Sequence, residues 1–329
     1  MRKTSAAFLA ACGAAALLLA GCGQSPNAPA AGNGAEDEPT ELVFAAVPSE
    51  DSESLEAAFA PVVAALEHEL DIPVRFEPVS SNAGVIEAQV AERVDIAVYG
   101  AFSYYLATGV ADVVPVAVDE RAPGADPSIS AYGLVRAGDG ISAISEAAGQ
   151  KVCFTDPASS TGYLAPAAGL IEEGVDAEND ITPVFAGGHD ASVLALLSGD
   201  CDLAYAAQAF VDDILPAQGA LEPDDVEVIW TSDPIPGPPF VLGGWLSDDL
   251  QERITEALLK YNAVTAAEAG FCEGAEIDAP DSWGELAGEP ACMWGGTGAF
   301  SFIPTDAAAY EPIAKICETT QADVCRADS

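Results

Sequence analysis

Residues 151 to 164 read Lys151-Val152-Cys153-Phe154-Thr155-Asp156-Pro157-Ala158-Ser159-Ser160-Thr161-Gly162-Tyr163-Leu164. The pattern predicts a short apolar strand, a turn that contains a proline, and a helix that starts at three successive hydroxyl residues and runs to about Glu173. One interpretation is a plain helix cap, because serine and threonine bond the free N–H groups of a helix start. Three successive hydroxyl residues are more than a helix cap requires. With the free amides and the helix dipole, they also predict a site for a small oxyanion.

A second helix start lies one strand–helix unit further along the chain. The segment Gly187-Gly188-His189-Asp190 follows a strand predicted over 181–185, and Asp190 is expected to cap the helix. Ligands of α/β proteins bind where such helix starts meet at the carboxyl ends of the strands. We therefore predict that the hydroxyls of Ser159, Ser160 and Thr161 surround a small anion near the point where the two helix starts meet.

Strands alternate with helices along most of the chain. This alternation predicts an α/β fold of mostly parallel sheets with helices on both faces. Strands are expected at 41–47, 74–79, 95–99, 113–118, 130–136, 181–185, 201–206 and 226–231, and helices at 52–70, 82–93, 190–198, 248–268 and 305–317.

Proline- and glycine-rich breaks at 122–127 and 233–239 divide this pattern into two lobes. We predict lobe 1 from residues 41–129 and 238–329, and lobe 2 from residues 130–237. Two crossings would then join the lobes into a hinged clamshell, with the ligand between them.

The N-terminus has the form of an export signal. Arg2 and Lys3 precede an apolar run over 6–20 that is too short for a stable membrane helix. The run ends in Leu19-Ala20-Gly21-Cys22, which resembles a bacterial lipobox; an ordinary signal peptide is the alternative. The resemblance implies that residues 1–21 are removed, that Cys22 carries lipid, and that the protein is held at the outer face of the cytoplasmic membrane. Residues 22–40 would form a flexible tether.

The cysteines also indicate an oxidising compartment. Of the eight, Cys12 would leave with the signal and Cys22 would be lipidated, so six remain and predict three disulfides. Six cysteines allow many pairings. Proximity in the predicted sheet and short spacing favour the pairs Cys153–Cys201, Cys272–Cys292 and Cys317–Cys325. No CxxC motif or cluster of histidines occurs, so we expect neither a metal nor another cofactor.

The chain is strongly acidic. It has 53 acidic residues against 11 Lys and Arg, a net charge of −42, and loss of Arg2 and Lys3 would make the mature charge about −44. Without a basic patch the chain is not expected to bind nucleic acid. The charge does not exclude an anionic ligand, because exposed charges are screened beyond about 8 Å.

Five segments occur in the order typical of one family: 95–104, 156–166, 187–190, 230–238 and 302–313. Over about residues 41 to 317, the chain resembles the phosphate/phosphite/phosphonate-type solute-binding proteins of ABC importers. The resemblance implies a type II periplasmic-binding-protein fold. It also implies a monomer that delivers its ligand to a permease driven by an ATPase.

In that family the hydroxyl run and the histidine hold the phosphoryl oxygens, which implies this role for Ser159, Ser160, Thr161 and His189. Family members that bind aminophosphonates carry acids where this chain has Ala209 and Pro238, so we expect an amine-free phosphorus oxyanion. Further candidate ligand contacts are Asn82, Tyr99, Ser130 and Gln208.

Three other functions are open at this stage. A binding protein of this type can present its ligand to a receptor kinase, and the ligand can be another oxyanion. A phosphatase or esterase with Ser159 or Ser160 as nucleophile, His189 as base and Asp190 as its partner is disfavoured. The chain has no G-x-S-x-G motif, and neighbouring residues at one helix start do not form the base–orienter geometry.

Overall fold

The computed structural model describes residues 38–47, 52–296, 298–321 and 325. The predicted signal peptide, Cys22 and nearly all of the predicted tether lie outside these residues. Within the described part of the chain, no helix combines the length and the apolar character needed to cross a membrane.

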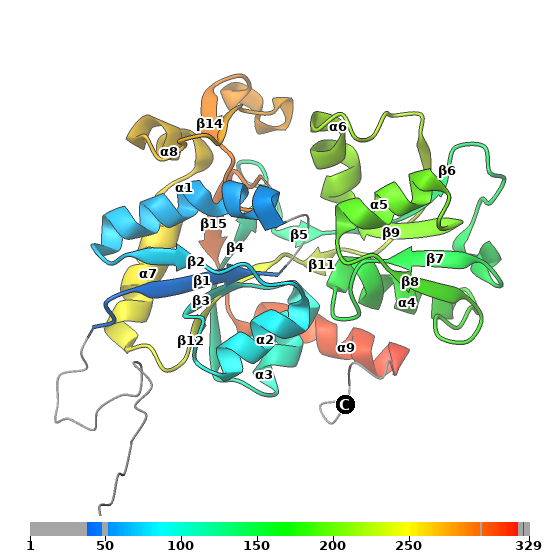
Figure 1. Cartoon of the computed structure of the whole chain (residues 1–329), viewed down its shortest axis with the longest axis horizontal. Coiled ribbons are helices and arrows are strands. Elements are labelled where there is room, and N and C mark those ends of the chain that lie inside the picture. The colour runs from blue at the N-terminus through cyan, green and yellow to red at the C-terminus, as the bar shows by residue number, and fades with distance from the viewer. Residues whose placement is uncertain (1–37, 48–51, 297, 322–324, 326–329) are drawn as a thin grey trace, which may run out of the picture. The chain divides into compact units, whose positions relative to one another are not determined.

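The strands alternate with helices for most of the described chain (Figure 1). The strands are β1 Leu42–Ala46, β2 Val74–Phe76, β3 Ile96–Val98, β4 Val113–Glu120, β5 Ser128–Ile129, β6 Ala131–Arg136, β7 Lys151–Phe154, β8 Thr182–Phe185, β9 Leu203–Ala207, β10 Val226–Thr231, β11 Ile235–Pro236, β12 Pro239–Gly243, β13 Glu276–Asp278, β14 Pro290–Cys292 and β15 Ser301–Pro304.

The α-helices are α1 Ser52–Leu70, α2 Asn82–Val90, α3 Ala101–Thr108, α4 Ala165–Glu172, α5 His189–Ser198, α6 Leu215–Ala217, α7 Asp248–Lys260, α8 Ala263–Ala269 and α9 Glu311–Thr320. Shorter turns are 3₁₀ at Ile144–Ala147, Asp281–Leu286 and Ala307–Tyr310, and π-helical at Ser160–Leu164 and Phe210–Ile214.

Two sheets organise the described residues. A six-stranded sheet has the order β15-β4-β12-β3-β1-β2, and a five-stranded sheet has the order β10-β6-β9-β7-β8. We call the first sheet with its helices lobe 1 and the second sheet with its helices lobe 2. The α/β class is as predicted, but both sheets are mixed rather than mostly parallel. In lobe 1, β12 runs antiparallel to β3 and β4; in lobe 2, β6 runs antiparallel to β9 and β10.

The chain crosses between the sheets twice, and the two crossing segments pair with each other. β5 and β11 form a short antiparallel ribbon in which Ile129 lies opposite Ile235. Strands β1 to β4, β12 and β15 belong to the lobe 1 sheet, and strands β6 to β10 belong to the lobe 2 sheet, while β13 and β14 form a separate two-stranded sheet. The predicted lobe boundaries at 129/130 and 237/238 fall at the ends of this ribbon.

Helices cover both faces of each sheet, which is why central strands such as β1, β3 and β12 are apolar and buried. The edge strands β8 and β10 are largely exposed. In β1, Phe44 packs with α1, α7 and α8, whereas the next residue, Ala45, faces the layer of α2, α3 and α9. Lobe 2 has the same arrangement, with α4 over one face of its sheet and α5 with α6 over the other. The helix α9 belongs to a cluster that also contains Leu164 and Ala165 of lobe 2.

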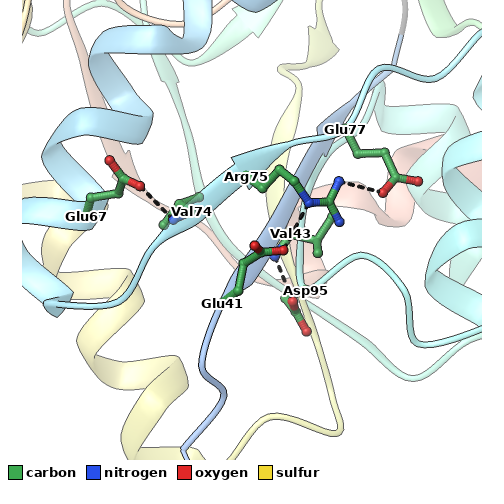
Figure 2. Close-up of polar contacts among 7 residues, drawn as sticks. All are labelled: Glu41, Val43, Glu67, Val74, Arg75, Glu77 and Asp95. Carbon is green, nitrogen blue, oxygen red and sulfur yellow. Dashed lines mark hydrogen bonds and ion pairs between the residues drawn. The ribbon is translucent and has the colours of Figure 1, made fainter. Parts of the chain in front are cut away.

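Charged residues close the edge of lobe 1 at β1 and β2 (Figure 2). The guanidinium of Arg75 bonds Glu41 and Glu77, each at 3.0 Å, and Glu67 accepts the amide proton of Val74. Beneath them the Asp95 carboxylate accepts the amide proton of Val43 at 2.8 Å. Burial raises the pKa of Asp95 despite this bond. Some of the many carboxylates of the chain are therefore hydrogen-bond acceptors that hold strands β1 and β2 in place.

Three disulfides join the six predicted cysteines in the favoured pairing. Cys153–Cys201 ties β7 to the segment before β9, Cys272–Cys292 ties the end of α8 to β14, and Cys317–Cys325 holds the end of α9.

One predicted long helix is two helices. Within the segment expected over 248–268, the first helix, α7, ends at Lys260 because Tyr261 has an extended backbone. The Asn262 side-chain oxygen then caps α8 by accepting the amide proton of Thr265, and the Thr265 hydroxyl oxygen in turn accepts the backbone amide proton of Asn262. This reciprocal capping box starts a new helix where periodicity alone predicted continuation.

Candidate functional site

A cavity of about 220 Å³ contains most of the predicted site residues. Both lobes and the connecting ribbon contribute to its wall. The lining residues are Val47, Asn82, Gly100, Arg121, Ser128, Ile129, Ser130, Thr155, Ser159, Ser160, Thr161, His189, Ala207, Gln208, Ala209, Phe210, Asp213 and Pro238.

The hydroxyl run forms one end of the cavity. Ser159 is the N-cap, and its Oγ accepts the amide proton of Gly162 at 3.0 Å. The next residues form a π-helical turn rather than the regular helix expected, and Leu164 N–H donates to the Ser159 carbonyl. Ser160 and Thr161 are each about 3% exposed. The wide turn therefore keeps all three hydroxyls at the cavity wall.

Gly162 is required by this arrangement. A Cβ atom at this position would lie 1.8 Å from Thr155 Oγ1 and 2.5 Å from Thr155 Cγ2. Thr155 follows β7 and packs directly behind the turn, so no larger residue fits without moving it. The glycine thus allows the hydroxyl run to close against the end of the strand.

Ser160 connects the two lobes. Its Oγ accepts the amide proton of Phe102, at the start of α3 in lobe 1, at 2.9 Å. Because a serine hydroxyl can donate one proton while it accepts, the Ser160 O–H stays available for a ligand oxygen. The same side chain therefore holds lobe 1 close and serves the cavity.

His189 is the first residue of α5, and its ring is buried beside Phe210. Nδ1 accepts the amide proton of Ala207 at 3.0 Å, so the proton of the neutral ring is on Nε2. Burial lowers the pKa of His189 to about 4. At neutral pH the ring is therefore an uncharged donor. Asp190 lies in the first turn and Gly188 is the N-cap, so the prediction that Asp190 caps this helix was wrong.

Three further predicted residues, Asn82, Ser130 and Gln208, line the cavity. Asn82 is the buried first residue of α2, and Gln208 Nε2 donates to Asp212 Oδ2 at 2.9 Å. The predicted ligand contact of Tyr99 is not seen in the structure. Tyr99 is fully buried in lobe 1, its hydroxyl donates to Gln89 Oε1 at 3.0 Å, and it is not among the lining residues.

Sequence reasoning missed four polar residues of the cavity, namely Ser128 of β5, Thr155, Arg121 and Asp213. Thr155 is 2% exposed, and its Oγ1 is buried without a hydrogen-bond partner. Arg121 and Asp213 form an ion pair from opposite lobes, with Nη2 3.3 Å from Oδ2. A signal for Thr155 was present, because it immediately follows a strand within the hydroxyl stretch. Arg121 and Asp213 lie outside every motif.

The site is suited to bind an oxyanion. Its hydroxyls and the His189 ring are fixed donors in a largely apolar wall, where hydrogen bonds to a charged acceptor are strong. The two positions expected to carry acids in amine-binding relatives, Ala209 and Pro238, both line the cavity and are uncharged.

Sequence comparison places these features in a known context. The family described as "ABC transporter, phosphonate, periplasmic substrate-binding protein" matches residues 44–281. The Phosphate-import protein PhnD of Mycolicibacterium smegmatis is 35% identical over 331 residues, with 97% of both chains covered. The Phosphonates-binding periplasmic protein of Escherichia coli is 24% identical over 239 residues, covering 71% of this chain and 70% of that protein.

Solved structures show the same fold. PhnD1 of Prochlorococcus marinus in complex with methylphosphonate has a TM-score of 0.71 and 16% identity, with 86% of this chain and 99% of that chain covered. A binding protein component of an ABC phosphonate transporter from Pseudomonas aeruginosa has the same TM-score and 21% identity, with 86% and 87% covered. The type II periplasmic-binding-protein fold implied by the sequence is confirmed.

Proposed function

The chain belongs to the phosphonate periplasmic substrate-binding proteins of ABC transporters, and we propose that its cavity holds the phosphoryl oxygens of a small, amine-free phosphorus oxyanion. As a family member it is a substrate-binding component of a transporter. The observation that carries the ligand proposal is the gathering of the buried hydroxyls of Ser160 and Thr161 with the His189 ring at one cavity.

The donors act in a defined way in this proposal. His189 offers Nε2–H to one ligand oxygen, because its Nδ1 is engaged by the backbone of Ala207. Ser160 donates to another oxygen while accepting from Phe102 of lobe 1, so the contact between the lobes and the ligand contact use the same atom. Ser159 and Thr161 complete the set, and donors that are fixed beforehand lose little entropy on binding.

The ligand is phosphate, phosphite or a simple alkylphosphonate in this proposal. Ala209 and Pro238 offer no carboxylate to an amine, and the relative from Mycolicibacterium smegmatis is named for phosphate import. Export follows from the family, while delivery to a permease with its ATPase, the monomeric state and the lipid on Cys22 are part of the proposal. The lipobox segment 19–22 supports the anchor.

The remaining alternatives have less support. The matched family and the named relatives are transport components, so we do not propose the sensory function. Family members are binding proteins rather than enzymes. In this chain the ring atom that a carboxylate would orient in a hydrolase, Nδ1 of His189, is bonded to a backbone amide.

Isothermal titration calorimetry tests the ligand proposal. Phosphate, phosphite, methylphosphonate, 2-aminoethylphosphonate and sulfate are titrated into the purified protein, with His189→Ala as the site variant and His68→Ala as the control on the exposed face of α1. We expect binding of a phosphorus oxyanion that is weakened only by His189→Ala. A preference for sulfate or for the amine, or equal effects of the two variants, would refute the proposal.

A further inference from the structure

We propose that Arg121 and Asp213 together decide which charge class of ligand the cavity accepts. Arg121 neutralises the Asp213 carboxylate and presents a guanidinium to the ligand, so the cavity selects oxyanions without an ammonium group. This inference rests on the proposed function and adds a specificity determinant from residues outside the hydroxyl and histidine motifs.

The two residues approach the cavity from different lobes. Arg121 follows the last residue of β4 in lobe 1, and its backbone carbonyl is held by Trp283 Nε1 at 2.8 Å. Asp213 lies in the π-helical turn Phe210–Ile214 of lobe 2. Arg121 Nη2 donates to Asp213 Oδ2 at 3.3 Å, and both residues line the cavity. The pair is thus a second polar contact between the lobes, besides that of Phe102 with Ser160.

Arg121 has donor capacity left for a ligand. Its Nη1 is buried and has no hydrogen-bond partner, although the side chain as a whole is 26% exposed. A buried guanidinium N–H without an acceptor is unfavourable, and a phosphoryl or phosphonyl oxygen is an acceptor that matches the geometry of its planar fork. Thr155 Oγ1, also buried and unpartnered at the same cavity, adds a second unused donor. The cavity therefore contains buried donors that a bound acceptor would satisfy.

The neighbouring acid shows what is particular to Asp213. Asp212 accepts hydrogen bonds from Gln208 Nε2 and from the Tyr132 hydroxyl, and it does not line the cavity. Asp213 lines the cavity, and Arg121 is its ion-pair partner. Among the described residues of the wall, Arg121 is the one arginine or lysine and Asp213 the one carboxylate.

This arrangement predicts the effect of removing Arg121. With the guanidinium present, an amine-bearing ligand must displace it from Asp213 and accept a repulsive cation nearby. Without it, Asp213 would be a free carboxylate that attracts an ammonium group and repels a simple oxyanion. Removal of Arg121 would therefore lower the affinity for a simple oxyanion and raise the affinity for a ligand that carries an ammonium group.

Calorimetry with two ligands measures that preference as a ratio. Methylphosphonate and 2-aminoethylphosphonate are titrated into the wild type, Arg121→Met, Asp213→Asn and the double variant. Arg93→Met, at an exposed arginine of lobe 1 that does not line the cavity, controls for the change in net charge. Circular dichroism melts confirm that each variant is folded.

We expect the wild type and Arg93→Met to prefer methylphosphonate. In Arg121→Met, methylphosphonate affinity should fall by about tenfold to about a hundredfold, the range for losing a bond to a charged group. The ratio should shift towards the amine by at least about tenfold. In the double variant that shift should disappear, because no free carboxylate remains. Asp213→Asn alone should leave the amine disfavoured.

The outcomes separate two failures. If the wild type binds none of methylphosphonate, phosphate and phosphite, the proposed function fails and this inference with it. If the wild type binds methylphosphonate but the ratio in Arg121→Met equals that of the wild type, or the shift persists in the double variant, only the role of the pair is overturned. Should Arg121→Met not fold, an amine preference in Asp213→Asn would equally refute it.

Discussion

Burial of a neutral histidine makes the stability of the ligand-free protein depend on pH in a defined direction. Burial lowers the pKa of His189 to about 4 from its ordinary value of 6.5. Between these values the unfolded chain binds a proton that the folded chain does not. The free energy of unfolding must therefore rise with pH in this window, and fall as the pH is lowered.

The magnitude follows from the two pKa values. Between about pH 7.5 and about pH 5, the His189 contribution should fall by about 2 kcal/mol, and by about 3 kcal/mol once both states are protonated. The window above about pH 5 is chosen because most carboxylates do not titrate there.

The measurement is urea denaturation across this pH range for the wild type and for His189→Asn. Asparagine does not titrate, and its side-chain oxygen can accept the Ala207 amide proton that Nδ1 accepts now. The difference in unfolding free energy between the two proteins should decrease by about 2 kcal/mol from about pH 7.5 to about pH 5. His68→Asn, at a largely exposed ring, is the matched control and should keep the wild-type pH dependence. A difference that stays flat, or that grows as the pH falls, would falsify the neutral, buried state of His189.

Three more predictions concern the hydroxyl stretch and its strand. Gly162→Ala should destabilise the protein by about 3 kcal/mol in urea denaturation, at the upper end for overpacking, because even the Cβ of Thr155 would lie 2.7 Å from the new methyl group. Thr155→Gly should restore much of that loss; no recovery would mean that the clash is elsewhere. Ser160→Ala should weaken oxyanion binding in calorimetry by about 1–3 kcal/mol, and an unchanged affinity would remove it from the site. Replacing both Cys153 and Cys201 by alanine should lower the unfolding free energy by about 4 kcal/mol, since the bridge spans 48 residues of sequence, and a loss within error would contradict this.

The sequence predicted which segments form strands better than it predicted strand direction. Alternation of strand and helix implies a parallel neighbour, and β1 with β2 and β3, or β7 with β8 and β9, are parallel. The antiparallel exceptions include β6 and β12, the strands that follow the two crossings. A strand that enters a sheet from the other lobe has no crossover helix to fix its direction, so the local pattern contains no signal for it.

The site residues likewise could be predicted only where a local sequence pattern marks them. Ser159, Ser160, Thr161 and His189 could be predicted because each helix start gives its own local signal. Tyr99 was placed wrongly because a residue just after a strand can lie in the core or in a cleft. The π-helical turn could not be foreseen either, since it depends on how Gly162 packs against Thr155.

The proposed roles of Arg121 and Asp213 would explain how a strongly acidic protein binds an anion. Their charges cancel within the described wall of the cavity, and the other donors there, including the His189 ring, are uncharged. The many exposed carboxylates act through water and salt, which weaken their field beyond about 8 Å. A bound oxyanion instead contacts its donors at about 3 Å in a largely apolar pocket, where a hydrogen bond to a charge is strongest. In the proposed site, recognition would depend on the local donors and on one cross-lobe ion pair rather than on the net charge of −42.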